Sequence, residues 1–261
     1  LELFLSNPLS KEQDRLRRSL VPNTVNNIKL NSRYSDEFRI YELGRVYLKK
    51  SRKSAELAVE KTMVTGAIYR KKPDAPLFYE AKGVVTGLLA KLQIADYSLV
   101  PEVKALPPYA HPARSMLVMV GRETAGTIFE LHPDAVAAFD ISGAAALFDI
   151  DISILYGAPK KNSVFVELQK YPEVPFEVSV LADRRAYAGD ICALIEKSNR
   201  ELIQSVEVVS TYEGLPIPEG KKSISIKAVF ASKDRTLTPE EIEKLQKGTI
   251  EALNKKGYQL R

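Results

Sequence analysis

The chain has 261 residues, a formal net charge of +5, 45% apolar residues and 27% charged residues. This ordinary globular composition excludes a wholly disordered chain, and no apolar run approaches the roughly 18 residues that a membrane helix needs. The single cysteine, Cys192, excludes an internal disulfide and a cysteine-based zinc site, and two histidines leave little for a histidine-rich metal site.

The first half of the chain predicts an antiparallel sheet with helices on one side. Apolar side chains recur at a loose helical spacing around Pro22, which predicts either a break at this proline or a second helix that begins with it. Residues 38–48 alternate like a strand, with Phe38, Ile40 and Glu42 on one face. Gly44 allows a bulge or bend in that strand. The remaining patterns predict a loop at 49–61, a strand at 63–69, a helix at 78–92, a hairpin of 116–120 with 126–131, a short helix at 133–139 and a closing strand at 144–155.

A polar segment with glycine and proline, residues 157–163, predicts a linker between a first domain at 1–160 and a second at 163–261. The second domain has the element order βαββαβ, which is the ferredoxin-like arrangement. Its second helix has the clearest start, because Thr238 and Glu241 form a capping box with a proline between them. The whole chain is therefore predicted to be an α+β protein. The expected elements are strands at 177–182, 202–212, 222–231 and 258–260, and helices at 188–197 and 239–256.

Two helices on one face of a four-stranded sheet leave the other face open. Alternation along the third strand turns its isoleucines toward the helices and Ser223 toward the open face. Ser179 and Tyr212 also face outward, while a bulge in the second strand turns Val209 inward. Hydroxyl groups beside an aromatic ring are typical of sheets that bind single-stranded RNA, although such a face can equally meet solvent or another domain. Ser210, Ser225 and Lys227 complete the predicted open face.

Charge is only a weak indication of a nucleic-acid partner. Residues 1–53 hold twelve basic and six acidic side chains, whereas residues 162–261 hold fifteen of each. A basic surface attracts nucleic acid, but most such excess is simply a solvated face.

Several short motifs follow one another at a characteristic spacing. They are NPLS at 7–10 with LRRSLVP at 16–22, YELGRVY at 41–47, HPARS at 111–115 with FELHP at 129–133, YP at 171–172, YEG at 212–214, KKS at 221–223, RTLT at 235–238 and a final Gly257 with LR at 260–261. In order and spacing they resemble the C-terminal part of the bacterial phenylalanyl-tRNA synthetase beta subunit, over essentially the whole chain. The resemblance implies a non-catalytic, class II synthetase-like module at 1–160 and a ferredoxin-fold anticodon-binding domain at 163–261. It also implies that the tRNA-binding and editing modules of that family are missing here, in keeping with a start that has neither Met nor a signal peptide.

From this resemblance we expect the first module to pair with the catalytic alpha chain and the second to recognise the anticodon of tRNA(Phe). The expected assembly has two alpha and two beta chains, lies in the cytoplasm and has no membrane partner. ATP and Mg²⁺ are expected mainly at the alpha chain, so no catalytic, cofactor-binding or metal-binding residue is expected here. The apolar segment 78–92 is expected to contribute an exposed surface for the partner chain.

The resemblance also suggests individual RNA-binding residues. In that family the tyrosine ending strand two and the serine opening strand three lie at the anticodon site, and they match Tyr212 and Ser223. We expect Tyr212 to stack on an unpaired base, Ser223 and Ser179 to hydrogen-bond the edge of that base, and Lys222 to contact phosphates. The sequence departs from the family at 175–177, where Pro-Phe-Glu replaces a basic pair and an aspartate, and at Ser210, where an aspartate is common.

An active site in the first module is the main alternative. Adenylation requires cations that stabilise phosphate charge, and class II enzymes supply them from a strand arginine and a glycine-rich motif that ends in arginine. Residues 141–149 contain one glycine and no arginine, and Arg39 is expected on an exposed face. A free-standing enzyme with a degenerate site and a plain protein-interaction scaffold therefore remain alternatives to the non-catalytic reading. We expect structural roles for His111 and His132 at hairpin ends, and a packed thiol at Cys192.

Overall fold

The computed structural model describes residues 3–10, 14–49, 58–101, 106–162, 164–165 and 167–261. The chain divides into two compact units, a first unit at 1–164 and a second unit at 165–261. The predicted linker directly precedes this division, although its last residue, Ser163, lies outside the described residues. None of the described helices is both long and apolar enough to span a membrane.

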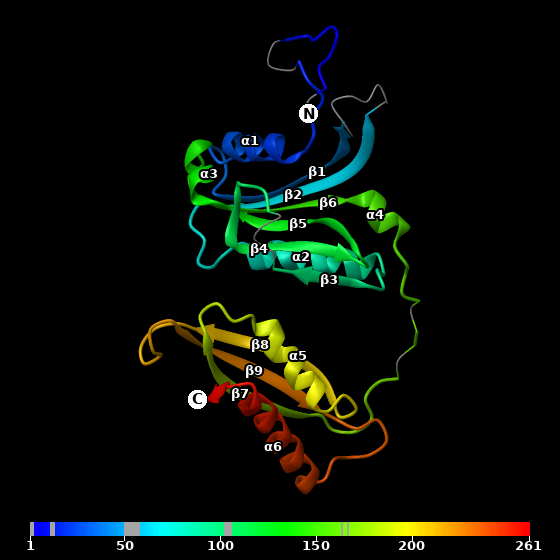
Figure 1. The fold of residues 1–261 in the computed structure, drawn as a ribbon, viewed down its shortest axis with the longest axis vertical. Coiled ribbons are helices and arrows are strands. Elements are labelled where there is room, and N and C mark those ends of the chain that lie inside the picture. Colours follow the sequence, from blue (N-terminus) through cyan, green and yellow to red (C-terminus); the bar gives the residue numbers. More distant parts are fainter. Residues whose placement is uncertain (1–2, 11–13, 50–57, 102–105, 163, 166) are drawn as a thin grey trace. The chain divides into compact units, whose positions relative to one another are not determined.

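A six-stranded antiparallel sheet in the order β1-β2-β6-β5-β4-β3 forms the first unit (Figure 1). The strands are β1 (Glu37–Leu48), β2 (Val59–Arg70), β3 (Tyr97–Val100), β4 (Ala110–Val120), β5 (Glu123–Leu131) and β6 (Ala144–Asp151). The predicted loop at 49–61 ends earlier than expected, since β2 begins at Val59, and residues 50–57 lie outside the described residues. The sequence does not predict β3, because an edge strand of four residues is too short to show alternation.

β1 and β2 form a long hairpin whose register is unbroken over all twelve residues, so Gly44 introduces no bulge. Phe38 and Ile40 pack into the same core, as alternation predicts, and the Phe38 ring stacks on Tyr69 with 4.8 Å between centroids. Gly66 of β2 meets Phe148 of β6, whose ring would lie 2.2 Å from a Cβ at this position. Glycine is therefore required where the two strands meet.

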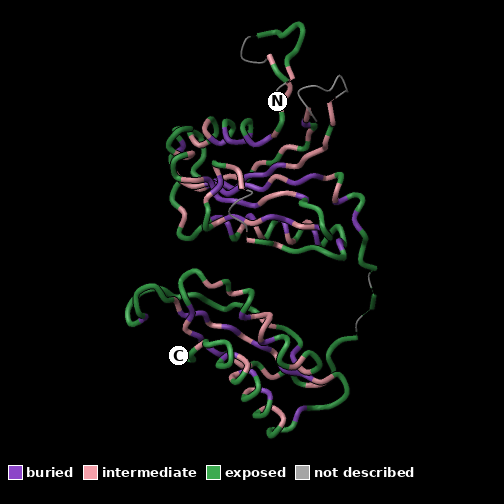
Figure 2. Tube along the Cα trace, in the orientation of Figure 1, coloured by how far each residue is buried: buried purple, intermediate pink, exposed green. Residues whose placement is uncertain are grey.

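Helices cover both faces of this sheet, so the expectation of helices on one side is wrong. α1 (Val21–Asn31) packs in one core with Ala67, and α2 (Phe78–Lys91) packs in another core with Ile68. Consecutive residues of a strand point to opposite faces, so the two cores lie on opposite sides of the sheet. The inner strands are accordingly buried on both faces, as the buried stretches in Figure 2 show. Strands buried on both faces have continuous apolar sequences, so the sequence does not show whether helices cover one face of the sheet or both.

The predicted closing strand at 144–155 is also wrong at its end. β6 stops at Asp151, whose side chain accepts a hydrogen bond of 2.9 Å from the Ser153 N–H and so caps the short helix α4 (Ile152–Gly157). An aspartate with extended backbone is a favoured helix N-cap. The other short helix, α3 (Pro133–Ala138), matches its prediction, and His132 caps it in the same way.

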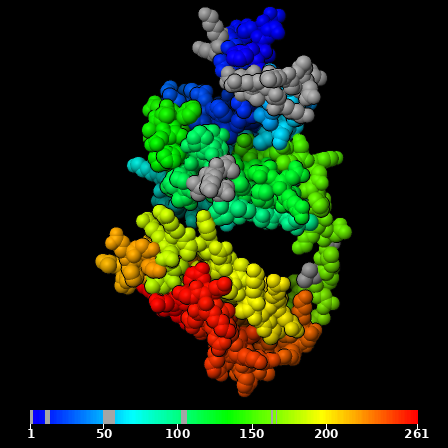
Figure 3. All heavy atoms as spheres, viewed as in Figure 1, coloured from blue at the N-terminus to red at the C-terminus, as the bar shows by residue number. Residues whose placement is uncertain are grey.

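The second unit has the predicted βαββαβ order, with a sheet in the order β10-β7-β9-β8. Its elements are β7 (Val174–Asp183), α5 (Ala188–Ser198), β8 (Ile203–Tyr212), β9 (Lys221–Phe230), α6 (Pro239–Lys255) and β10 (Gln259–Leu260). The two helices lie side by side (Figure 1), so that yellow and orange-red atoms adjoin in Figure 3, and they share one core with the sheet. Cys192 of α5 packs against this core, as expected, and burial raises the pKa of its thiol.

The predicted bulge in β8 is present, between Val208 and Ser210 in the pairing with β9. It does not turn Val209 inward, however, because Val209 is half exposed and Val206 packs against the core instead. A bulge places two residues opposite one, so the inward and outward positions are exchanged beyond it. The residue at which this exchange occurs cannot be read from a run of valines.

The start of α6 follows its prediction closely. The Thr238 side chain accepts a hydrogen bond from the Glu241 N–H, and the Glu241 carboxylate accepts one from the Thr238 N–H, at 3.4 and 3.0 Å. Arg235 also donates to this carboxylate, and that hydrogen bond is the main reason why the pKa of Glu241 falls to about 2. The box thus satisfies backbone groups that a helix end otherwise leaves open.

One buried hydroxyl in α6 lacks a partner. Thr249 is 0% exposed, and its Oγ1 has no hydrogen-bond partner within the described part of the chain. A buried polar group in this state costs roughly 1–3 kcal/mol, and valine replaces the hydroxyl with a methyl group. We expect Thr249→Val to raise the free energy of unfolding by about 1 kcal/mol, seen as a higher urea midpoint. Thr249→Ser, which keeps the hydroxyl and loses the methyl group, should lower that midpoint; a valine variant no more stable than the parent would contradict this account.

Candidate nucleic-acid interface

A row of three serines crosses the uncovered face of the second unit's sheet. Ser179 of β7 lies opposite Ser225 of β9, and Ser225 lies opposite Ser210 of β8. The Oγ atoms of Ser179 and Ser225 are 2.8 Å apart, which is hydrogen-bonding distance. None of the three is buried, and they lie on the face that alternation predicts. The three side chains form a small, polar and accessible surface.

Tyr212 and Ser223 face each other directly in the next row of the sheet. Tyr212 is 48% exposed, and its hydroxyl donates a hydrogen bond of 2.8 Å to the carbonyl oxygen of Leu215. Ser223, expected to be accessible, is only 3% exposed. The tyrosine is therefore available at the surface, whereas the serine lies beneath neighbouring side chains.

Arg261 lies beside Tyr212, and the sequence prediction did not include it as a site residue. The Arg261 N–H donates to the Ser179 carbonyl oxygen at 2.9 Å, so its backbone lies beside β7, whereas Tyr212 lies on β8 at the other side of the sheet. The guanidinium carbon is nevertheless 5.9 Å from the centre of the Tyr212 ring, within the range of a cation–π contact. The two side chains thus meet above β9, which carries Ser223.

Lys222 does not share the face of Tyr212. It pairs with Ala182, which belongs to the core under the helices, so alternation in β9 puts Lys222 on the helix side. The prediction assigned phosphate contacts to Lys222 without placing it on the open face. Arg185, between β7 and α5, is exposed and forms no ion pair with the described residues, so it is a further cation at this end of the sheet.

Most other charges near this surface are paired. Lys221 forms an ion pair of 2.6 Å with Asp183, and Arg184 forms one of 3.0 Å with Glu213. Paired cations attract phosphate weakly, because the neighbouring carboxylate cancels much of their field. Affinity for RNA at this face must therefore come from stacking and hydrogen bonding more than from net charge.

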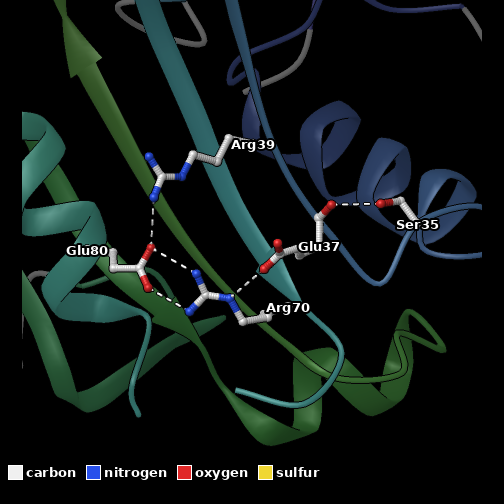
Figure 4. A network of polar contacts seen from close by, with 5 residues as sticks. All are labelled: Ser35, Glu37, Arg39, Arg70 and Glu80. Carbon is white, nitrogen blue, oxygen red and sulfur yellow. Dashed lines mark hydrogen bonds and ion pairs between the residues drawn. The ribbon is translucent and has the colours of Figure 1, made fainter. Parts of the chain in front are cut away.

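In the first unit, Arg39, the arginine considered for an adenylation site, forms an ion pair with a carboxylate of the protein itself (Figure 4). Arg39 is exposed, as predicted, and its Nη2 lies 3.0 Å from Glu80 of α2. Arg70 binds the same carboxylate at 2.7 Å and also reaches Glu37 at 3.2 Å. The hydrogen bond from Arg70 is the main cause of the lowered pKa of Glu80. The two guanidinium groups are thus held by protein carboxylates, in a network that links α2 to β1 and β2.

The histidines also have local structural partners. His132 caps α3, and His111 Nδ1 lies 3.1 Å from the Ala113 N–H. Burial lowers the pKa of His111, and Arg114 beside it acts in the same direction. Arg114 in turn forms an ion pair of 2.7 Å with the buried Glu130. These contacts favour the expected structural roles over nucleophilic or acid–base chemistry.

Comparison with known proteins agrees with this division. Residues 169–261 match the family described as the ferredoxin-fold anticodon binding domain. Residues 2–152, more than half of the chain, match the phenylalanyl tRNA synthetase beta chain CLM domain. The chain therefore belongs to the phenylalanyl-tRNA synthetase beta chain family.

Similar curated proteins carry the same description. The phenylalanine–tRNA ligase beta subunit of Solibacter usitatus is 31% identical over 98% of this chain, and that of Bacillus subtilis is 30% identical over 97%. The chain spans about a third of the length of these relatives, since it covers 32% of each. Among solved structures, a pyrrolysyl tRNA synthetase of Desulfitobacterium hafniense aligns over 59% of this chain and 52% of its own, with 21% identity and a TM-score of 0.46.

Proposed function

We propose that this chain is the non-catalytic part of a phenylalanine–tRNA ligase beta subunit that recognises the tRNA anticodon and pairs with the alpha chain. The observation that carries the proposal is the match of both units, in order, to two modules of that family. In the proposed assembly two alpha and two beta chains act together in the cytoplasm. ATP, Mg²⁺ and phenylalanine bind mainly in the alpha chain, and the present chain supplies recognition surfaces.

The exposed aromatic and the serine row support the anticodon role of the second unit. An unpaired base stacks on the Tyr212 ring, beside the guanidinium of Arg261. Ser179 and Ser225 offer hydroxyl groups to the base edge. Ser223 contributes after the side chains above it move aside, and Lys222 meets phosphates around the end of β9.

The free edge of β1 supports the pairing role of the first unit. β1 pairs only with β2 among the described strands, and Arg17 hydrogen-bonds its outer side at Arg45 and Tyr47, so the part of the strand before Arg45 presents a sheet edge. Tyr41 and Leu43 are 79% and 62% exposed on this strand. A long edge with exposed apolar side chains is a ready site for another chain. In the predicted surface at 78–92, the first unit's own core buries Phe78, Val85 and Leu89, whereas Tyr79, Val84 and Leu92 stay exposed.

The experiment that tests this function uses the chain with and without a matching alpha chain. Co-expression should yield a stable complex that binds tRNA(Phe), whereas the chain alone should give no phenylalanine-dependent pyrophosphate exchange. We expect no exchange because Arg39 is already paired with Glu80 and because β6 contains no arginine that could stabilise phosphate charge. Exchange by the purified chain alone would favour the free-standing enzyme. A complex that forms normally but binds tRNA no better than the alpha chain alone would favour the plain scaffold.

A further inference from the structure

A cavity of about 270 Å³ opens on the first unit's sheet, beyond the part that α1 covers. α1 packs over Ala67 and Leu147, and the cavity continues along the same face of β2 and β6 at Met63 and Asp149. Its volume equals that of about nine water molecules in the liquid. Its walls combine charged and apolar side chains, among them Arg18, Val46, Leu48, Lys61, Met63 and Asp149.

Asp149 is the carboxylate in this cavity that forms no ion pair with a cation of the described residues. Thr65 donates a hydrogen bond to its Oδ1, and its Oδ2 accepts none from the described residues. The neighbouring Asp151 is fully engaged, because Lys61 lies 2.7 Å from one oxygen and the Ser153 N–H donates to the other. Burial raises the pKa of Asp149, and the nearby charge of Asp151 adds to this effect. A positively charged group of a ligand would stabilise the ionised form of Asp149 and so offset both effects.

Arg18 supplies the opposite charge at the wall of the same cavity. The preceding arginine, Arg17, is tied down by Glu42 at 2.5 Å and by the Arg45 carbonyl oxygen at 2.8 Å. Arg18 is exposed and forms no hydrogen bond or ion pair with the described residues. The cavity therefore presents one unpaired anion and one unpaired cation, with apolar surface between the strands.

We propose that this cavity binds a free α-amino acid with an apolar side chain, its ammonium group at Asp149 and its carboxylate at Arg18. Charge-assisted hydrogen bonds to both ends fix the backbone of the ligand. Leu48 and Met63 contact the side chain, and the remaining volume limits its size. A simple amine or a simple acid satisfies only one of the two charges, so the cavity selects the zwitterion.

The stability of the fold offers an independent check on Asp149. The groups that face it are Thr65, Asp151 and Tyr109, while Arg18 and Lys61 line the same cavity. A carboxyl whose pKa is raised by folding destabilises the native state above its unfolded pKa, and this penalty disappears as the pH falls below that value. Asp149→Asn should therefore raise the urea midpoint at pH 7, and by less at pH 4. A carboxylate kept at a cost in stability is typical of a binding site.

The test is a titration of the full 261-residue chain with L-leucine, followed by ¹H–¹⁵N NMR. We expect saturable shifts at the cavity, and at least about tenfold weaker binding of 3-methylbutylamine, which lacks the carboxylate, and of 4-methylpentanoate, which lacks the amine. Asp149→Asn and Arg18→Gln should each weaken L-leucine binding about tenfold or more. Asp74→Asn and Arg33→Gln change exposed residues outside the cavity lining and should leave binding unchanged.

The urea midpoint separates loss of binding from loss of structure, since Asp149→Asn is expected to be at least as stable as the parent chain at pH 7. The proposal is wrong if L-leucine gives no saturable response, or if both cavity variants bind it like the parent. Equal affinity for the amine and the amino acid would remove Arg18 from the site and overturn the zwitterion assignment. Displacement of L-leucine by millimolar MgCl₂ would identify a cation site instead.

Discussion

Tyr212→Ala should weaken the binding of tRNA(Phe) to the complex of this chain with its alpha chain about 5- to 150-fold. Stacking of a base on an aromatic ring is worth roughly 1–3 kcal/mol, and Tyr212 is the exposed ring beside the serine row. The measurement is the dissociation constant by filter binding at one fixed salt concentration, because phosphate contacts make it salt-dependent. Circular dichroism of the variant shows whether the fold is intact.

The matched control is Tyr212→Phe, which keeps the ring and loses the hydroxyl that binds the Leu215 carbonyl oxygen. If the ring stacks on a base, the phenylalanine variant should bind tRNA within about threefold of the parent. If Tyr212 only fastens the connection between β8 and β9, the phenylalanine variant should behave like the alanine variant. Unchanged affinity in a folded Tyr212→Ala chain would remove this residue from the interface.

The fold could be predicted wherever the sequence of a single strand or helix contains a local pattern, such as alternation or a capping motif. The capping box of α6 and the alternation of β9 are such signals, and both match the structure. The layers of the first unit could not be predicted, because β2 and β6 are apolar on both faces and their periodicity is lost. The change from β6 to α4 was also hidden, since a single side chain, that of Asp151, sets it within an apolar run.

The interface was predicted only as far as alternation reaches. Alternation correctly places Ser179, Ser225 and Tyr212 on one face, but it cannot show that Ser223 is buried. Nor can alternation show that Arg261 reaches the Tyr212 ring across strands that are far apart in sequence. The RNA-binding roles of Tyr212, Ser223, Ser179 and Lys222 stay predictions. The terminal Gln259-Leu-Arg261 stretch carried a usable signal, because alternation along β10 puts Arg261 on the same face as Ser179.

The cavity at Asp149 shows the same limit in the first unit. Periodicity treats Asp149 as one more position of a buried strand, and nothing local marks Arg18 as its counterpart. The two residues are brought to one cavity only by the pairing of β6 with β2 and by the segment that leads into α1. A site assembled from separate elements is visible only when their relative positions are known.

The second large effect is expected at the edge of β1. Leu43 is exposed on a strand whose outer side is free of other described strands, and an aspartate there places a charge in the proposed contact with the alpha chain. Removal of a central apolar anchor typically costs 2–4 kcal/mol of binding free energy, so Leu43→Asp should weaken association with the alpha chain roughly 30- to 1000-fold. The measurement is the dissociation constant by analytical ultracentrifugation or calorimetry with purified chains.

The matched control is Val100→Asp, which introduces the same charge at an exposed apolar position on β3, the opposite edge of the same sheet. Both substitutions are at surface positions, so each should change the stability of the isolated chain by no more than about 0.5 kcal/mol. If β1 is the contact, Val100→Asp should associate with the alpha chain like the parent while Leu43→Asp does not. The reverse result would move the interface to the β3 edge, because a charge impairs association only where the partner chain excludes water from it.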